Sequence, residues 1–165
     1  MDLKQKMEDA LNDQVNAELY AGHIYLSMSA YCETLNLGGF GNWMREQAKE
    51  EYGHAMRIYK HIVERGGTVK LGQIDAPPVK WKNPLDAFKG AYDHEVKVTK
   101  MINDLVDLAR KLDDKAAESF LKWFIDEQVE EEEQTDSIVA QLKMIGDSNI
   151  GLIMLDRALA KRGGD

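Results

Sequence analysis

Apolar residues recur through most of the chain at intervals of three to five positions, which places them on one face of an α-helix. Residues 3–35 form the first such stretch, and residues 39–65 form the second. Residues 84–112 and 115–145 repeat the pattern. A shorter stretch, ending near residue 161, predicts a fifth helix that is too apolar to lie free in solvent. The pattern therefore predicts an all-α fold.

The residues between these stretches are of the types that begin and end helices. Asn83 and Pro84 suit the N-cap and the first turn of the third helix, and Asp114 suits the N-cap of the fourth. Glycines stand at the expected ends of the first, second and fourth helices: Gly38, Gly66 and Gly146. Residues 162–165, which follow the fifth helix, are expected to form a frayed tail.

The segment from Gly66 to Asn83 contains glycines and two adjacent prolines and has no helical period. A connection of about 18 residues without structure is unusual in a compact domain. A helix of about 27 residues is about 40 Å long, whereas about 18 extended residues reach at most roughly 60 Å. The segment can therefore return along the whole length of a bundle. This predicts a four-helix bundle with one long crossover between helices 2 and 3 and a short fifth C-terminal helix.

Composition narrows the class of protein. The chain has 165 residues, 44% of them hydrophobic and 30% charged, so we expect a single domain over residues 1–165. The net charge of -8 argues against a nucleic-acid partner and suits the attraction of cations. No signal peptide and no apolar run of the roughly 20 residues that a membrane span needs is visible, so we expect a cytoplasmic protein with no membrane partner. The single cysteine, Cys32, excludes a disulfide within the chain.

Glu51 and His54 are three residues apart in the second predicted helix, so both side chains lie on one face about one turn apart. Carboxylate oxygen and neutral imidazole nitrogen can both bind an iron-type metal ion. The same spacing is common by chance, and it also fits two solvated residues on a polar helix face. The pair alone does not decide between these interpretations.

An internal repeat makes the pair more informative. Glu18 precedes Glu51 by 33 residues, and Glu95 precedes Gln128 by the same number. Adding 77 to three residue numbers of the first helical hairpin gives three residues of the second: Glu18 and Glu95, Glu51 and Gln128, His54 and Glu131. All six lie near the middle of their helices. The four long helices are therefore expected to direct carboxylates toward one central point.

Several buried carboxylates in one place repel one another and are costly unless they are protonated or bound to cations. Two divalent cations would neutralise four carboxylates, with His54 as a neutral ligand. The repeat therefore predicts a buried site for two metal ions. The acidic run over residues 126–133 of the fourth helix would, without the repeat, be interpreted as a solvent-exposed helix face.

Four motifs together resemble those of non-haem ferritins of the bacterial or archaeal type, which belong to the ferritin-like di-iron carboxylate proteins. They are Asn16-Ala17-Glu18-Leu19-Tyr20, Glu50-Glu51-Tyr52-Gly53-His54, His94-Glu95 and Glu127-Gln128-Val129-Glu130-Glu131. The resemblance covers essentially the whole chain, from the first helix to the short fifth one.

The resemblance implies that Glu18, Glu51 and His54 bind one iron ion. It implies that Glu51 bridges to a second iron, and the residues expected around that second iron are Glu95, Glu131 and, nearby, Gln128. Bacterial-type ferritins often have a third iron position close by, and the residues that match it are Glu50, Glu127 and Glu130, with Glu131 shared.

Tyr25 lies seven residues after Glu18 and matches a family tyrosine that hydrogen-bonds near the site and can supply an electron. A core aromatic residue with a satisfied hydroxyl is an equally good interpretation. Trp123 fits core packing better than a redox role. His94 is not needed as a ligand and could instead contact the residues that bind iron.

Differences from related families are also informative. Bacterioferritins place a haem-ligating methionine directly after the bridging glutamate, where this chain has Tyr52, so no haem is expected. Rubrerythrins carry an additional iron domain that needs two cysteines. Mini-ferritins that protect DNA lack the fifth helix and build their sites between subunits.

The function implied by the resemblance is that of a ferroxidase and iron store. Iron(II) would be oxidised by O2 or H2O2, and the ferric mineral would be kept inside a hollow homo-oligomer, usually of 24 subunits. A di-iron oxidase or oxygenase with an organic substrate would use similar ligands but needs a substrate cavity. A catalytically silent shell-forming subunit is the third alternative.

Overall fold

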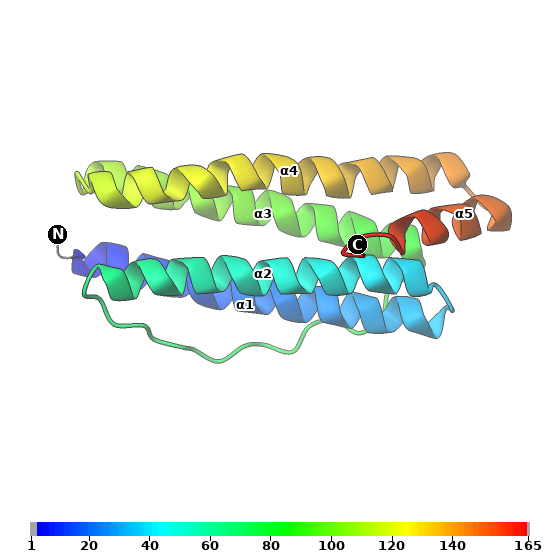
Figure 1. The fold of residues 1–165 in the computed structure, drawn as a ribbon, viewed down its shortest axis with the longest axis horizontal. Helices are drawn as coiled ribbons and strands as arrows, with labels where there is room; N and C mark the ends of the chain where they lie inside the picture. Colours follow the sequence, from blue (N-terminus) through cyan, green and yellow to red (C-terminus); the bar gives the residue numbers. More distant parts are fainter. Residues whose placement is uncertain (1–2, 165) are drawn as a thin grey trace.

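The computed structural model describes residues 3–164, which form five helices and one long extended connection (Figure 1). The helices are α1 (Gln5–Thr34), α2 (Gly38–Glu64), α3 (Pro84–Lys111), α4 (Lys115–Ile145) and α5 (Asn149–Leu159). α1 and α2 pack together as one hairpin, and α3 and α4 form the other. The connection from α2 to α3 runs beside the first hairpin along the bundle, which confirms the predicted four-helix bundle with one crossover and a fifth helix (Figure 1). Within residues 3–164 no helix is both long and apolar enough to cross a membrane.

Polar side chains begin three of the helices, as the residue types predict. The side chains of Asn83, Asp114 and Ser148 each accept a hydrogen bond from a backbone amide three residues further along, at 2.8, 3.0 and 3.1 Å. Gly146 ends α4 with a φ of 54°, a conformation that glycine adopts without strain. The helix boundaries therefore follow from local residue chemistry.

Two apolar clusters fill the two halves of the bundle. Tyr25, Phe40 and Phe88 belong to one cluster, and Leu11 and Ile58 belong to the other. On each long helix a short polar stretch separates the residues of the two clusters. The buried polar residues of these stretches include Glu18, Glu51, His54, Glu95, Gln128 and Glu131. The bundle therefore contains one polar layer near its middle, closed on both sides by apolar packing.

Two asparagines of α1 hold the crossover in place. Asn12 donates to the carbonyl of Thr68 at 2.9 Å and accepts from the amide of Lys70 at 2.6 Å. One turn later, Asn16 donates to the carbonyl of Lys70 at 3.2 Å and accepts from the amide of Gly72 at 2.8 Å. The two amide side chains thus pair with the extended backbone much as a neighbouring strand would. This explains how a segment without internal hydrogen bonds of its own keeps one path along the bundle.

α5 lies against the first turn of α2. The carboxylate of Asp156 accepts a hydrogen bond from the amide of Phe40 at 3.0 Å, which satisfies one of the free amides at the start of α2. A Cβ on Gly39 would approach the carbonyl oxygen of Asp156 to 1.7 Å, so this contact requires glycine. Asn42 donates to the carbonyl of Arg162 at 2.9 Å. The end of the chain is therefore fixed to α2 by specific contacts.

The expectation of a frayed tail over residues 162–165 is wrong for Arg162. Its guanidinium donates to Gln47 and Glu50, both at 2.8 Å, and lies over the ring of Trp43. These contacts join residues more than 110 positions apart, so local composition does not reveal them. Asp165 lies outside the described residues.

We expect Asn12→Ala to lower the melting temperature by about 5 °C. The substitution leaves backbone groups of the crossover without their hydrogen-bond partner, and each buried polar group left in this way costs about 1–3 kcal/mol. Proteolysis within residues 66–83 should accelerate in the same variant. Thermal unfolding and limited digestion measure the two effects. Asn103→Ala, at an exposed position of α3, is the matched control and should change neither. Equal behaviour of the two variants would contradict the role assigned to Asn12.

Candidate metal centre

All four long helices contribute to the polar layer in the middle of the bundle. α1 supplies Glu18, and α3 supplies Glu95. α2 and α4 each supply two residues three positions apart: Glu51 and His54, and Gln128 and Glu131. Each of the six residues is at most 5% exposed, because the apolar clusters close the layer on both sides.

The layer contains two groups of potential metal ligands that have one member in common. Ligand atoms of Glu18, Glu51 and His54 all lie within 4.8 Å of one another, and so do those of Glu51, Glu95 and Glu131. Glu51 can therefore contact a cation in either group. The structure thus brings together all five residues that the sequence predicted as ligands of two iron ions.

Two buried glutamines donate to these carboxylates but leave some oxygens without a partner. Gln14 donates to Glu18 at 2.9 Å, and Gln47 donates to Glu51 at 3.0 Å and to Glu131 at 2.6 Å. Among the described residues, Oε2 of Glu18 and Oε1 of Glu131 are buried without a hydrogen-bond partner. An unpartnered buried oxygen costs about 1–3 kcal/mol, and a cation in either group would satisfy it.

Burial and mutual repulsion make these carboxyl groups hard to ionise. Burial is the larger cause of the raised pKa of Glu18, Glu51 and Glu95. Burial, together with repulsion from the charge of Glu95, raises the pKa of Glu131 to about 8. Without cations the layer therefore retains protons near neutral pH, and cations would bind in their place.

The ferritin-like domain family matches residues 8–145 of the chain. The chain belongs to the ferritin family. A bacterial non-haem ferritin of Bacteroides fragilis (strain 638R) is 40% identical over 160 residues, which cover 97% of this chain and 99% of the relative. The bacterial non-haem ferritin of Staphylococcus aureus (strain USA300) is 38% identical over 160 residues, which cover 97% of this chain and 96% of the relative.

Solved structures agree with this assignment. An open-pore ferritin from the hyperthermophilic archaeon Archaeoglobus fulgidus superimposes with a TM-score of 0.97 at 46% identity, over 98% of this chain and 99% of that chain. A closed form of the same archaeal ferritin, engineered by site-directed mutagenesis, matches equally well, with a TM-score of 0.97. The resemblance to bacterial and archaeal non-haem ferritins predicted from the motifs is therefore confirmed.

The residues predicted for a third iron position of this ferritin are only partly assembled. Oε1 of Glu127 lies 3.5 Å from Nε2 of His54, and the two form a third group of potential ligands with Glu131. Glu50 and Glu130 are exposed and belong to none of the three groups found among residues 3–164. Glu50 is paired with the C-terminal tail instead of facing Glu127.

Tyr25 belongs to the apolar cluster that contains Phe40 and Phe88, and it contacts the centre from there. It is fully buried, and its hydroxyl donates to Oε1 of Glu95. Burial and the charge of Glu95 hold the pKa of Tyr25 well above its ordinary value, so the phenol keeps its proton. The ring of His94 packs edge-on against Tyr25 with the centroids 6.4 Å apart, so His94 contacts a neighbour of the ligands. Trp123 packs edge-on against His54 at 5.5 Å.

Sequence reasoning missed the two donor glutamines and Arg162. Gln14 stands four residues before Glu18, and Gln47 stands four residues before Glu51. This shared i, i+4 spacing on the two helices of the first hairpin was a usable signal, because it places each amide on the face of its carboxylate. No comparable signal marks Arg162.

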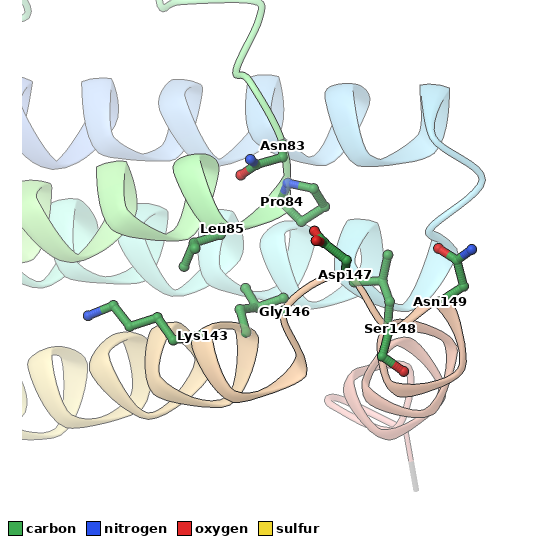
Figure 2. Close-up of a pocket in the computed structure, with 10 residues that line it drawn as sticks. Asn83, Pro84, Leu85, Lys143, Gly146, Asp147, Ser148 and Asn149 are labelled. Carbon is green, nitrogen blue, oxygen red and sulfur yellow. The ribbon is translucent and has the colours of Figure 1, made fainter.

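Two surface pockets lie near one end of the bundle and beside the polar layer, respectively. One pocket, of about 480 Å³, lies between the start of α3 and the α4–α5 turn. Asn83, Lys143 and Asp147 are among its lining residues (Figure 2). Another pocket, of about 340 Å³ on the outer face of α3 and α4, reaches Gln128 but none of the five predicted ligands. None of the five predicted ligands lines either pocket.

The raised carboxyl pKa values predict that the metal-free protein loses stability as the pH rises from about 5 to 8. The unfolded chain releases these protons near pH 4.5, whereas folded Glu131 keeps its proton up to about pH 8. The folded state therefore binds more protons throughout this window, and its stability falls with pH. Thermal unfolding of metal-free protein measures this slope, and Zn(II) should raise the melting temperature more at pH 8 than at pH 5.5.

Glu131→Gln should flatten the pH dependence, because its amide cannot ionise. Glu133→Gln removes a charge from an exposed position of the same helix and should leave the slope unchanged. A melting temperature of the metal-free wild type that stays constant or increases between pH 5.5 and 8 would contradict the assigned electrostatics.

Proposed function

We propose that this ferritin oxidises iron(II) at the buried carboxylate centre and stores the ferric product inside a hollow homo-oligomer. The observation that carries the proposal is the pair of ligand groups sharing Glu51 in a layer with unpartnered carboxylate oxygens. The names of the bacterial relatives, which describe non-haem ferritins, support the same function. Iron is the substrate and the stored product in this proposal.

Glu18, Glu51 and His54 would hold one iron, and Glu51, Glu95 and Glu131 the other. Gln128 has a different part, because its Nε2 donates to Oε2 of Glu95 at 3.2 Å. A nitrogen that carries these hydrogens cannot bind a metal ion, so only the amide oxygen of Gln128 is available as a ligand. Gln128 therefore orients Glu95 and can reach the second iron only through its oxygen.

The chemistry of the ligands favours oxidation of iron. Each iron(II) gives up one electron, so two neighbouring irons can reduce O2 to H2O2, or H2O2 to water, with two protons. Four carboxylates stabilise the 3+ charge more than the 2+ charge, because the Coulomb attraction grows with the charge of the ion. Water is excluded by the two apolar clusters, which strengthens this effect.

Glu127, near His54 and Glu131, supplies part of the third iron position, and Glu50 and Glu130 would complete it from the surface. These exposed carboxylates lie on the outer side of the buried layer, where an ion can exchange with solvent. The third position would therefore be a site through which iron enters or leaves the buried layer.

α5 supports assembly of several copies of the chain. Ile150, Ile153 and Met154 are 74%, 51% and 67% exposed on this helix, although all three are apolar. Exposed apolar residues grouped on one helix are typical of a surface that another protein covers. Neighbouring copies would cover them in a shell, for which 24 subunits is the expected number.

We expect Glu18→Gln to slow iron(II) oxidation by about tenfold or more and to remove about one tightly bound iron per chain, because a ligand is lost with almost no change in volume. Metal-free protein is mixed with graded iron(II) in air, and ferric absorbance and particle size are followed together. Glu133→Gln is the control and should behave like the wild type.

Three results of this experiment would contradict the proposal. Oxidation by Glu18→Gln at the wild-type rate would show that the assigned centre is wrong. Saturation at two irons without further uptake, in a wild-type monomer or dimer, would favour the di-iron oxidase instead. Absence of oxidation in the wild type would favour the silent subunit.

Tyr25→Phe should leave two iron ions bound but slow their oxidation several-fold, because Glu95 loses its hydrogen-bond donor and the centre loses a possible electron donor. Stopped-flow absorbance measures the rate, and rapid-freeze paramagnetic resonance detects a tyrosyl radical in the wild type. Tyr59→Phe, at an exposed position on α2, is the control. Identical rates and radical signals in both variants would show that Tyr25 serves packing alone.

A further inference from the structure

Arg162 extends from the C-terminal tail to α2, beside the candidate centre. Its guanidinium lies over the ring of Trp43, 4.3 Å from the centroid, and donates to Gln47 and Glu50, both at 2.8 Å. The side chain of Arg162 is only 17% exposed. Asn42 holds the backbone by donating to the carbonyl of Arg162 at 2.9 Å. A positive charge is therefore fixed at this point on α2.

Gln47 connects this charge to the candidate iron ligands. Its oxygen accepts from Arg162, while its nitrogen donates to Glu51 at 3.0 Å and to Glu131 at 2.6 Å. The oxygen of the amide group accepts hydrogen bonds, and its nitrogen donates them. Because the oxygen is bonded to Arg162, the nitrogen faces the carboxylates. Arg162 is thus one hydrogen-bonded residue away from ligands of both proposed irons.

Glu50 is the carboxylate that Arg162 neutralises, and it adjoins the third group of ligands. It precedes His54 by four residues on α2, so the two side chains lie on one face. Its charge also contributes to the raised pKa of Glu131. Glu50 is half-exposed and paired with Arg162, whereas Glu127 faces His54.

We propose that Arg162 is a tethered cation that competes with a third iron ion for Glu50. An iron ion near His54 and Glu127 gains the full charge of Glu50 only after the guanidinium, which is bonded to Oε2 of Glu50, has moved away. The tail therefore weakens the third binding step and separates it from the first two. This inference rests on the proposed function, since it concerns iron at the third position, and Arg162 acts in it as a positioning residue.

Arg162→Gln tests this competition, because glutamine keeps a polar side chain but removes the charge. Iron(II) is titrated into the assembled, metal-free protein without oxygen, and calorimetry resolves the successive binding steps. The third step should become roughly two- to fivefold tighter, the range that a partly exposed ion pair accounts for. The first two steps should change by less than about twofold, because their ligands remain.

Lys161→Gln is the matched control, because it removes the same charge from an exposed neighbour in the tail, and it should leave the third step unchanged. The double variant Arg162→Gln with Glu50→Gln should lose the tightening. Arg162→Lys keeps the charge but lacks the planar guanidinium that donates to both Glu50 and Gln47. It should therefore tighten the third step less than Arg162→Gln does. That variant decides the question if Arg162→Gln does not assemble.

The outcomes separate this inference from the proposed function. A third step that is unchanged or weaker in Arg162→Gln, with the first two steps intact, would overturn the role of Arg162 alone. Absence of the first two steps in the wild type would overturn the proposed function itself.

Discussion

The burial of four carboxyl groups in one layer is the constraint on which the rest of this structure depends. Glu18, Glu51, Glu95 and Glu131 are each almost completely removed from water, and each has a raised pKa. Such a layer destabilises the fold unless protons or cations neutralise it. The two apolar clusters on either side supply the packing that keeps the layer closed. Stability and cation binding are therefore opposite demands on the same residues.

Neutral donors reduce this conflict without removing it. Gln14 and Gln47 satisfy one oxygen of Glu18, one of Glu51 and one of Glu131, yet they add no positive charge that would compete for the central positions. Gln128 does the same for Glu95. A lysine or arginine at these buried positions would neutralise the carboxylates permanently. The guanidinium of Arg162 is bonded to this network, and it lies outside the layer, on Glu50 and Gln47.

The sequence predicted the fold and which residues meet in the central layer, because both depend on regular spacing. Helical periodicity and caps such as Asn83 and Asp114 are local, and the offset of 77 residues repeats one hairpin in the other. The contacts of Arg162 join residues more than 110 positions apart and follow no period. The exposed positions of Glu50 and Glu130 likewise depend on how side chains orient at the surface. Spacing fixes which helix face a residue occupies, but not which partner its flexible side chain selects.

Under the proposed competition, the position of Arg162 makes the third position dependent on the state of α5. This helix is held to α2 by Asp156 and Asn42, while its opposite side exposes Ile153 and Met154. If neighbouring copies cover that side, as we propose, assembly restrains the helix and therefore the tail that carries Arg162. A more restrained tail keeps the guanidinium on Glu50 for a larger fraction of the time. The third position should then be weaker in the assembled protein than in an isolated chain, although every residue of the site belongs to one subunit.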